Sequence, residues 1–356
     1  MSQTDNPLHD MASRLFGDLC QPTDLAKAET GQWPDAAWMA VEAAGLPGAL
    51  IPESAGGFGA SAVEALSVLR AAGEHALPLP LAETMMASWL LAKAAIPVPA
   101  GPISVISTNE PALKLSREGG RWRLTGPLRH IPWGRHVKTI IGVIEADGQN
   151  HVALIPTDGA KLECAYNIAR EPRDTLSLDV VLSDDHVAPS DVSALDLRAM
   201  GAAMRSQQIA GCLSRVTAMS VRYAQERIQF GRPIGKFQAI QQNLALLAAQ
   251  TAAANAVADL AAEAMIESGV EHLAIACAKV RCGEAASVAA PIAHQIHGAF
   301  GFTYEHSLHF YTKRLMAWRE EFGNETEWST RIGQAMIRNG ADRLWSGITE
   351  IGASRS

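Results

Sequence analysis

The sequence lacks the features of a secreted or membrane-spanning chain. Its five cysteines are scattered and include no Cys-x-x-Cys pair, which argues against a disulfide framework and indicates buried thiols in a reducing compartment. The first ten residues are polar and acidic and contain no apolar signal core. No apolar run reaches membrane-spanning length without charges or prolines. We therefore expect a soluble, cytoplasmic protein.

The sequence also lacks a surplus of positive charge and a recognisable metal motif. Its formal net charge of −7 argues against nucleic acid or an anionic membrane as a partner. Four histidines are spaced as metal sites permit, but no carboxylate–histidine helix motif accompanies them; they are His294, His297, His306 and His309. We expect no metal.

The texture of the chain changes twice, and 356 residues are too many for one simple core. Residues 1–100 carry the apolar spacing of helices, and residues 101–190 consist of short β-type runs separated by Gly, Asp, Asn and Pro. Residues 191–356 are almost wholly helical in pattern, rich in alanine and poor in aromatic residues. We predict a mainly α fold with an N-terminal helical domain, a small β-barrel-like middle domain and a C-terminal four-helix bundle.

The stretch Tyr223–Gln238 combines a helix end, a basic and aromatic corner, and a new helix. Gly231 and Pro233 interrupt the helical pattern, because glycine relaxes the backbone and proline removes a hydrogen-bond donor. Arg227 could bind a phosphate through its guanidinium, and Phe230 could cover an aromatic ring. The alternative is an ordinary helical hairpin with a solvated arginine.

Three stretches together resemble the acyl-CoA dehydrogenase family. In the first, Tyr, Glu-Arg, Phe-Gly, Pro-Ile and Phe-Gln recur at the family's offsets within residues 223–238. The second is Gln-Ile-His-Gly-Ala-Phe-Gly-Phe at residues 295–302, followed by Tyr311 and Arg314, and the third is Pro-Glu-Ser-Ala-Gly-Gly-Phe-Gly at residues 52–59. They span most of the chain in the family's order.

The resemblance implies the three-domain fold and an enzyme that removes hydrogen from the α and β carbons of an acyl-CoA thioester. A carboxylate would take the α-proton, and FAD would take the β-hydrogen as hydride. In this family the flavin ring and the adenine end of one FAD are held by different subunits of a dimer. An electron-transfer flavoprotein is the usual electron acceptor.

For the adenine and pyrophosphate end of FAD, the expected residues are all present. Arg227 would pair with the pyrophosphate. The residues that would pack against the adenosine, or approach it from the following helix, are Phe230, Ile234, Phe237, Ile240, Gln295 and Gly298. The alternatives are that Phe230 and Phe237 belong to the core and that Gln295 is a surface residue.

For the flavin end, the expected residues are altered. Only Asn109-Glu110-Pro111 echoes the family's Thr-Glu-Pro-x-Ala-Gly-Ser-Asp loop, and His130-Ile131-Pro132 replaces its Trp-Ile-Thr strand. Proline cannot donate a backbone hydrogen bond, and the threonine hydroxyl is lost. Trp133 could stack on the flavin or be an interior aromatic.

The position of the catalytic base is ambiguous. An ungapped count from Arg314 places Glu320 at the family's base position, whereas an alignment on Thr326 places Asn324 there with Glu325 beside it. The acidic residues could equally form a solvated face. The base position that some relatives use on an earlier helix is Gly201 here.

We therefore expect a subunit that completes the FAD site of a paralogous acyl-CoA dehydrogenase chain in a hetero-oligomer. One alternative is a self-sufficient homomeric enzyme that uses Glu320 or Glu325 as its base. The other is a flavin-free binding or scaffold protein that kept the fold.

Overall fold

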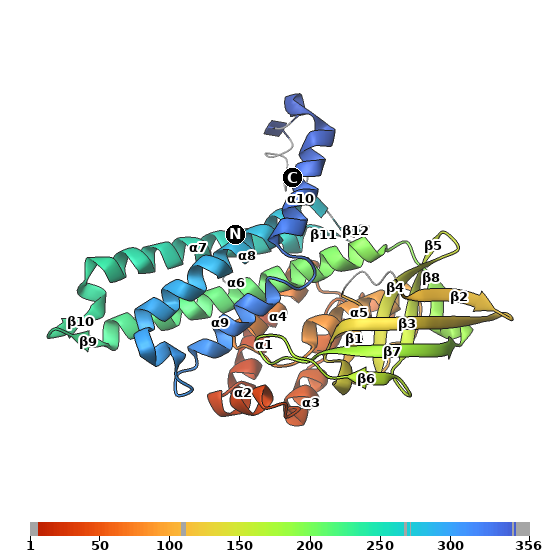
Figure 1. The fold of residues 1–356 in the computed structure, drawn as a ribbon, viewed down its shortest axis with the longest axis horizontal. Coiled ribbons are helices and arrows are strands. Elements are labelled where there is room, and N and C mark those ends of the chain that lie inside the picture. Colours follow the sequence, from red (N-terminus) through yellow and green to blue (C-terminus); the bar gives the residue numbers. More distant parts are fainter. Residues whose placement is uncertain (1–5, 108–111, 267–268, 271, 344, 347–356) are drawn as a thin grey trace. The chain divides into compact units, whose positions relative to one another are not determined.

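The structure is a computed structural model that describes residues 6–107, 112–266, 269–270, 272–343 and 345–346 (Figure 1). The helical N- and C-terminal parts and the β region between them confirm the predicted fold class. The helices are α1 (Pro7–Leu19), α2 (Pro22–Glu29), α3 (Asp35–Ala43), α4 (Ala62–Glu74), α5 (Leu81–Lys93), α6 (Ala194–Glu226), α7 (Gln238–Glu263), α8 (His272–His297), α9 (Leu308–Trp318) and α10 (Glu325–Asn339).

Two compact units form within the chain, and they do not follow the sequence order. One unit comprises residues 1–25, 66–77 and 202–356, and the other comprises residues 26–65 and 78–201. The boundaries placed after residues 100 and 190 from sequence remain predictions.

The second unit contains two four-stranded sheets. One sheet has the order β1 (Ile103–Val105), β4 (Thr139–Ala146), β5 (Gln149–Pro156), β8 (Val187–Pro189), and only its β1–β4 pair is parallel. The other has the order β2 (Lys114–Glu118), β3 (Arg121–Pro132), β7 (Arg173–Leu182), β6 (Lys161–Glu163), and is antiparallel. Apolar side chains from both sheets, among them Leu124 and Ile140, share one buried core.

The first unit is built on long helices with small side chains at their contacts, and two glycines on different helices fix one crossing. A Cβ atom at Gly73 of α4 would collide with the carbonyl oxygen of Gln208, and one at Gly211 of α6 would collide with that of Arg70. Each glycine thus lets the backbone of the facing helix approach its own. Alanines fill the interior of α8, which packs along α7 and against α9 and α10.

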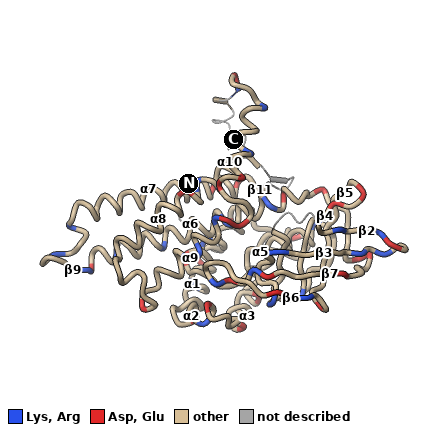
Figure 2. The backbone as a smooth tube through the Cα atoms, in the orientation of Figure 1, with Lys and Arg blue, Asp and Glu red and all other residues tan. Residues whose placement is uncertain are grey.

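Helix α7 corrects the expectation that no apolar run in the chain is long enough to span a membrane. Within the described ranges it is the one helix whose length and mean hydropathy would suit a membrane span. Its apolar character comes from alanine and leucine, and its polar residues are mostly uncharged, so Figure 2 shows few charges along it.

The break between α6 and α7 occurs where glycine and proline predict it. After α6 ends at Glu226, the two-residue strands β9 (Ile228–Gln229) and β10 (Arg232–Pro233) form a hairpin with Phe230 and Gly231 at its tip. The 3-10 turn Ile234–Lys236 then leads into α7. This hairpin forms one wall of the candidate site.

Candidate functional site

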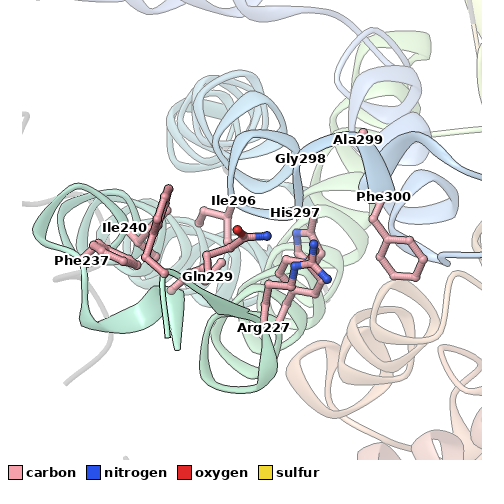
Figure 3. Close-up of a pocket in the computed structure, with 12 residues that line it drawn as sticks. Arg227, Gln229, Phe237, Ile240, Ile296, His297, Gly298, Ala299 and Phe300 are labelled. Carbon is pink, nitrogen blue, oxygen red and sulfur yellow. The ribbon is translucent and has the colours of Figure 1, made fainter. Parts of the chain in front are cut away.

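A cavity of about 610 Å³ lies between the hairpin and the end of α8 (Figure 3). Six of the seven residues predicted to hold the adenine end line it, namely Arg227, Phe230, Ile234, Phe237, Ile240 and Gly298. The other lining residues, which had no role predicted from sequence, are Tyr223, Gln229, Ile296, His297, Ala299 and Phe300. Five of these stand within the two resembling stretches beside assigned residues, and Tyr223 begins the first stretch, so proximity in the motif was an available signal.

Phe230 is held in a conformation that its own chemistry disfavours. Its φ of 52° is left-handed, Gly231 follows with a φ of 76°, and the Phe230 residue is 91% exposed. A two-residue hairpin tip with two positive φ angles normally carries Asn-Gly or Asp-Gly, because phenylalanine is strained there. The exposure excludes a core role for this ring. Strain and exposure together suit a side chain that covers a ligand.

The guanidinium of Arg227 lines the cavity and has no partner within the described structure. The residue is exposed, and its side chain makes no hydrogen bond or ion pair with any residue that the structure describes. Its backbone is fixed instead, because Arg227 donates its N–H to the Tyr223 carbonyl and accepts the Ile234 N–H. A fixed backbone with free donors at the end of the side chain suits an anion such as a pyrophosphate.

Gly298 leaves space that a side chain would occupy. It follows α8 with a left-handed φ of 59°, and an added Cβ would meet nothing within 4 Å. A ligand can therefore approach this backbone closely. Gln295 lies one turn earlier on α8; it is exposed and is not among the residues that line the cavity. Its contact with a cofactor remains a prediction.

Aromatic and histidine rings form the wall on the side of α8. The Tyr223 ring stacks on the His297 ring at 4.6 Å, and the His306 ring lies 4.7 Å from the His297 ring. The His297 Nδ1–H donates to the Ala293 carbonyl, and burial lowers the pKa of the ring. Burial and the neighbouring histidines lower the pKa of His306 to about 4. The wall is therefore uncharged at neutral pH.

In the described part of the chain, no three His, Cys, Asp or Glu side chains are grouped to hold a metal ion.

The segment between α9 and the start of α10 holds two carboxylates in close hydrogen bonds to arginine. Both Glu325 oxygens accept hydrogen bonds from Arg319, at 2.9 and 3.0 Å. Glu321 accepts from the buried Arg205 at 2.7 and 2.8 Å. Because guanidinium groups occupy these carboxylates, neither is a free proton acceptor.

Glu320, the first base candidate, lies on the outside of the same loop. Its side chain is 57% exposed, pairs with Arg319 Nε at 3.5 Å and accepts a hydrogen bond from the Asn324 amide at 3.3 Å. The loop is held from inside by Lys279, which is buried on α8 and donates to the carbonyls of Arg319 and Gly323 at 2.5 and 2.8 Å. The loop is thus fixed with Glu320 directed to solvent.

In the β-sheet unit, the altered flavin strand is occupied by contacts within the protein. Trp133 is 6% exposed, and its ring packs against Trp33 at 5.8 Å. The Ser104 hydroxyl donates to the Pro132 carbonyl at 2.5 Å. Trp133 is therefore an interior aromatic. Asn109-Glu110-Pro111 lies outside the described residues.

Comparison with known sequences matches the N-terminal and C-terminal parts of the chain to one family. Sequence models match the chain for the acyl-CoA dehydrogenase N-terminal domain at residues 2–96 and for the C-terminal domain at residues 193–351. The acyl-CoA dehydrogenase IpdE2 of Mycolicibacterium smegmatis is 28% identical over 343 residues, which cover 93% of this chain and 98% of the relative. FadE34 of Mycobacterium tuberculosis is 27% identical over 87% of this chain and 43% of its own length.

Solved structures share the fold at lower identity. A variant of the Tcur3481–Tcur3483 steroid acyl-CoA dehydrogenase superposes with a TM-score of 0.85 at 22% identity, over 93% of this chain and 97% of the matched chain. A chain of the ChsE4–ChsE5 complex of Mycobacterium tuberculosis gives 0.82 at 20% identity, over 96% and 99%.

Proposed function

The chain belongs to the acyl-CoA dehydrogenase family of oxidoreductases, and from that premise we propose that it completes the FAD site of a paralogous partner chain in a hetero-oligomer. The observation that carries the proposal is the contrast between its two half-sites. The cavity for the adenine end offers a free guanidinium, an exposed ring and an open glycine. The loop that would supply a base binds its inner carboxylates to arginines.

In this proposal, the chain's own residues bind and orient the cofactor. Arg227 pairs with the pyrophosphate, Phe230 covers the adenine, and Gly298 admits the ligand to the backbone after α8. FAD, when bound, supplies the hydride acceptor for α,β-dehydrogenation of an acyl-CoA. A carboxylate of the partner would take the α-proton.

The names of two solved structures support a two-chain assembly. Tcur3481–Tcur3483 and ChsE4–ChsE5 each name two different components. We propose that this chain likewise acts with a paralogue in the cytoplasm and passes electrons to an electron-transfer flavoprotein. A homomeric enzyme with Glu320 as base is the second candidate, because that carboxylate is the one in the loop exposed to solvent.

Co-expression tests the proposal. The chain is purified alone and together with the acyl-CoA dehydrogenase encoded beside it, and bound flavin is measured by absorbance and by release on denaturation. We expect the chain purified alone to be colourless. We expect the complex to be yellow and to lose its colour when acyl-CoA is added. Flavin bound tightly by the chain alone, with bleaching by acyl-CoA, would favour the homomeric enzyme. Absence of flavin from both preparations would favour a flavin-free scaffold.

A further inference from the structure

A second cavity, of about 220 Å³, lies beside the first on the same helix. Tyr223 lines both cavities, and no other residue does so. The remaining lining residues are Arg215, Ala218, Met219, Arg222 and Glu226 of α6, with His306 and Ser307. At roughly 30 Å³ for a water molecule, the space suits a small polar group and is too small for a dinucleotide.

Hydrogen-bond donors converge on this second cavity. Arg215 and Arg222 are seven residues apart, so α6 presents both from one face two turns apart. Arg222 is exposed and has no hydrogen bond or ion pair to any described residue, and the charge of Arg215 opposes the rise that burial gives the pKa of the Tyr311 hydroxyl. The cavity therefore holds one free guanidinium and a second guanidinium close to a tyrosine hydroxyl.

Two further donors come from the segment before α9. The Leu308 N–H donates to His306 Nδ1 at 3.1 Å, so the neutral imidazole carries its hydrogen on Nε2. The Ser307 side chain makes no capping hydrogen bond to α9. Its hydroxyl and the His306 Nε2–H can both donate to a ligand oxygen.

One acceptor stands among these donors. Glu226 is exposed, lines the cavity and is not ion-paired with a described residue, although Arg222 stands one turn before it on α6. Two cations and one carboxylate leave a net positive site. Such a site favours a ligand that combines an anionic group with a hydroxyl.

We propose that this second cavity binds a small phosphate ester, with its phosphoryl group on Arg222, Arg215 and Ser307 and a neighbouring hydroxyl on Glu226. Phosphate oxygens match the forked guanidinium donors, and a charge-assisted hydrogen bond is about twice as strong as a neutral one. The site is separate from the dinucleotide cavity, because Arg227 and Phe230 do not line it.

Titration calorimetry on the purified full chain tests this site with ribose 5-phosphate and with inorganic phosphate as probes. We expect saturable binding of ribose 5-phosphate, weaker binding of inorganic phosphate, and a loss of roughly tenfold in affinity for the ester in Arg222→Gln. Arg331→Gln is the matched control, since Arg331 is a half-exposed arginine of α10 that pairs with Glu327. Glu226→Gln should weaken the ester relative to inorganic phosphate, whose own binding should hold or strengthen because a neighbouring negative charge is lost.

The outcomes separate this proposal from the one above. Arg227→Ala should leave the ester affinity unchanged, and the ester can bind even if the chain never binds FAD. Equal losses in Arg222→Gln and Arg331→Gln would show non-specific attraction and overturn the site. If inorganic phosphate bound as tightly as the ester, the proposed hydroxyl contact with Glu226 would be wrong, and so would the proposal that the ligand is an ester. No saturable binding to the wild-type chain, with the helical circular-dichroism signal intact, would overturn the proposal altogether.

Discussion

The Phe230 ring stands edge-on to the Phe237 ring, with 6.1 Å between the centroids and 84° between the planes. The two rings come from the hairpin tip and from the residue before α7, and both line the larger cavity. This pair is the only contact between aromatic rings that the described structure gives for Phe230. The rest of that ring is open to a ligand.

Phe230→Asn should separate stability from binding. Asn-Gly is the preferred tip of a two-residue hairpin, so the free energy of unfolding should stay the same or rise by up to about 1 kcal/mol. Cofactor affinity should fall, because a flat apolar surface is lost. Urea unfolding and flavin titration of the assembly measure the two effects. A variant that is less stable yet binds the cofactor normally would show that the ring serves the fold.

Arg227→Ala should weaken FAD retention in the assembly that binds it. Loss of a charge-assisted phosphate contact costs about 1.5–3 kcal/mol, or roughly tenfold or more in affinity. Arg232→Ala is the matched control, because Arg232 lies in the same hairpin, stacks on Phe237 at 4.4 Å and does not line the cavity. Equal flavin content in wild type and Arg227→Ala would contradict the assignment.

Glu320→Gln and Glu325→Gln should leave the rate of flavin reduction by acyl-CoA nearly unchanged. Glu325→Gln should lower the free energy of unfolding by about 1 kcal/mol, because it breaks the two hydrogen bonds with Arg319, whereas Glu320→Gln should be nearly neutral, because its pair with Arg319 at 3.5 Å is exposed to solvent. Stopped-flow bleaching and thermal unfolding provide the two readouts. A rate loss near the ~10²-fold typical of a missing general base, with flavin content unchanged, would instead assign that residue as the base.

Lys279 should make stability depend on alkaline pH. Burial lowers the pKa of its ammonium from 10.5 to about 8 in the folded protein. Between these values the unfolded chain binds more protons, so the Lys279 contribution to the free energy of unfolding rises with pH, by at most about 1.4 kcal/mol per pH unit.

Denaturant unfolding between pH 7 and 10.5 measures that slope. Lys279→Met should remove this contribution and destabilise the protein, because the carbonyls of Arg319 and Gly323 lose their donor. Lys236→Met, at an exposed lysine, is the control. An unchanged slope in Lys279→Met would mean that the buried amine does not titrate in this range.

The break between α6 and α7 could be predicted from sequence because Gly231 and Pro233 are local signals that end one helix and permit the next. The residues of the larger cavity were predicted through the resemblance to a family; five of the six lie on or beside the hairpin, and Gly298 reaches the cavity from the end of α8. The state of the base loop could not be read in this way. The pairing of Glu321 with Arg205 joins residues 116 positions apart, and Lys279 reaches the loop from another helix. The burial of Trp133 could not be predicted either, because its ring packs against Trp33, which is far away in the sequence.

The glycine crossing of α4 and α6 sets the position of Tyr223 along α6, and so its position at both cavities. Gly211 fixes the helix against Arg70, and Tyr223 follows twelve residues later on the same uninterrupted helix. At 1.5 Å per residue, that distance is about 18 Å, and each residue advances the side-chain direction by about 100°. Removing one residue between Gly211 and Tyr223 would turn Tyr223 away from both cavities while the crossing itself stayed in place. The length of this segment is therefore constrained more tightly than its chemistry, and substitutions should be tolerated there far better than insertions or deletions.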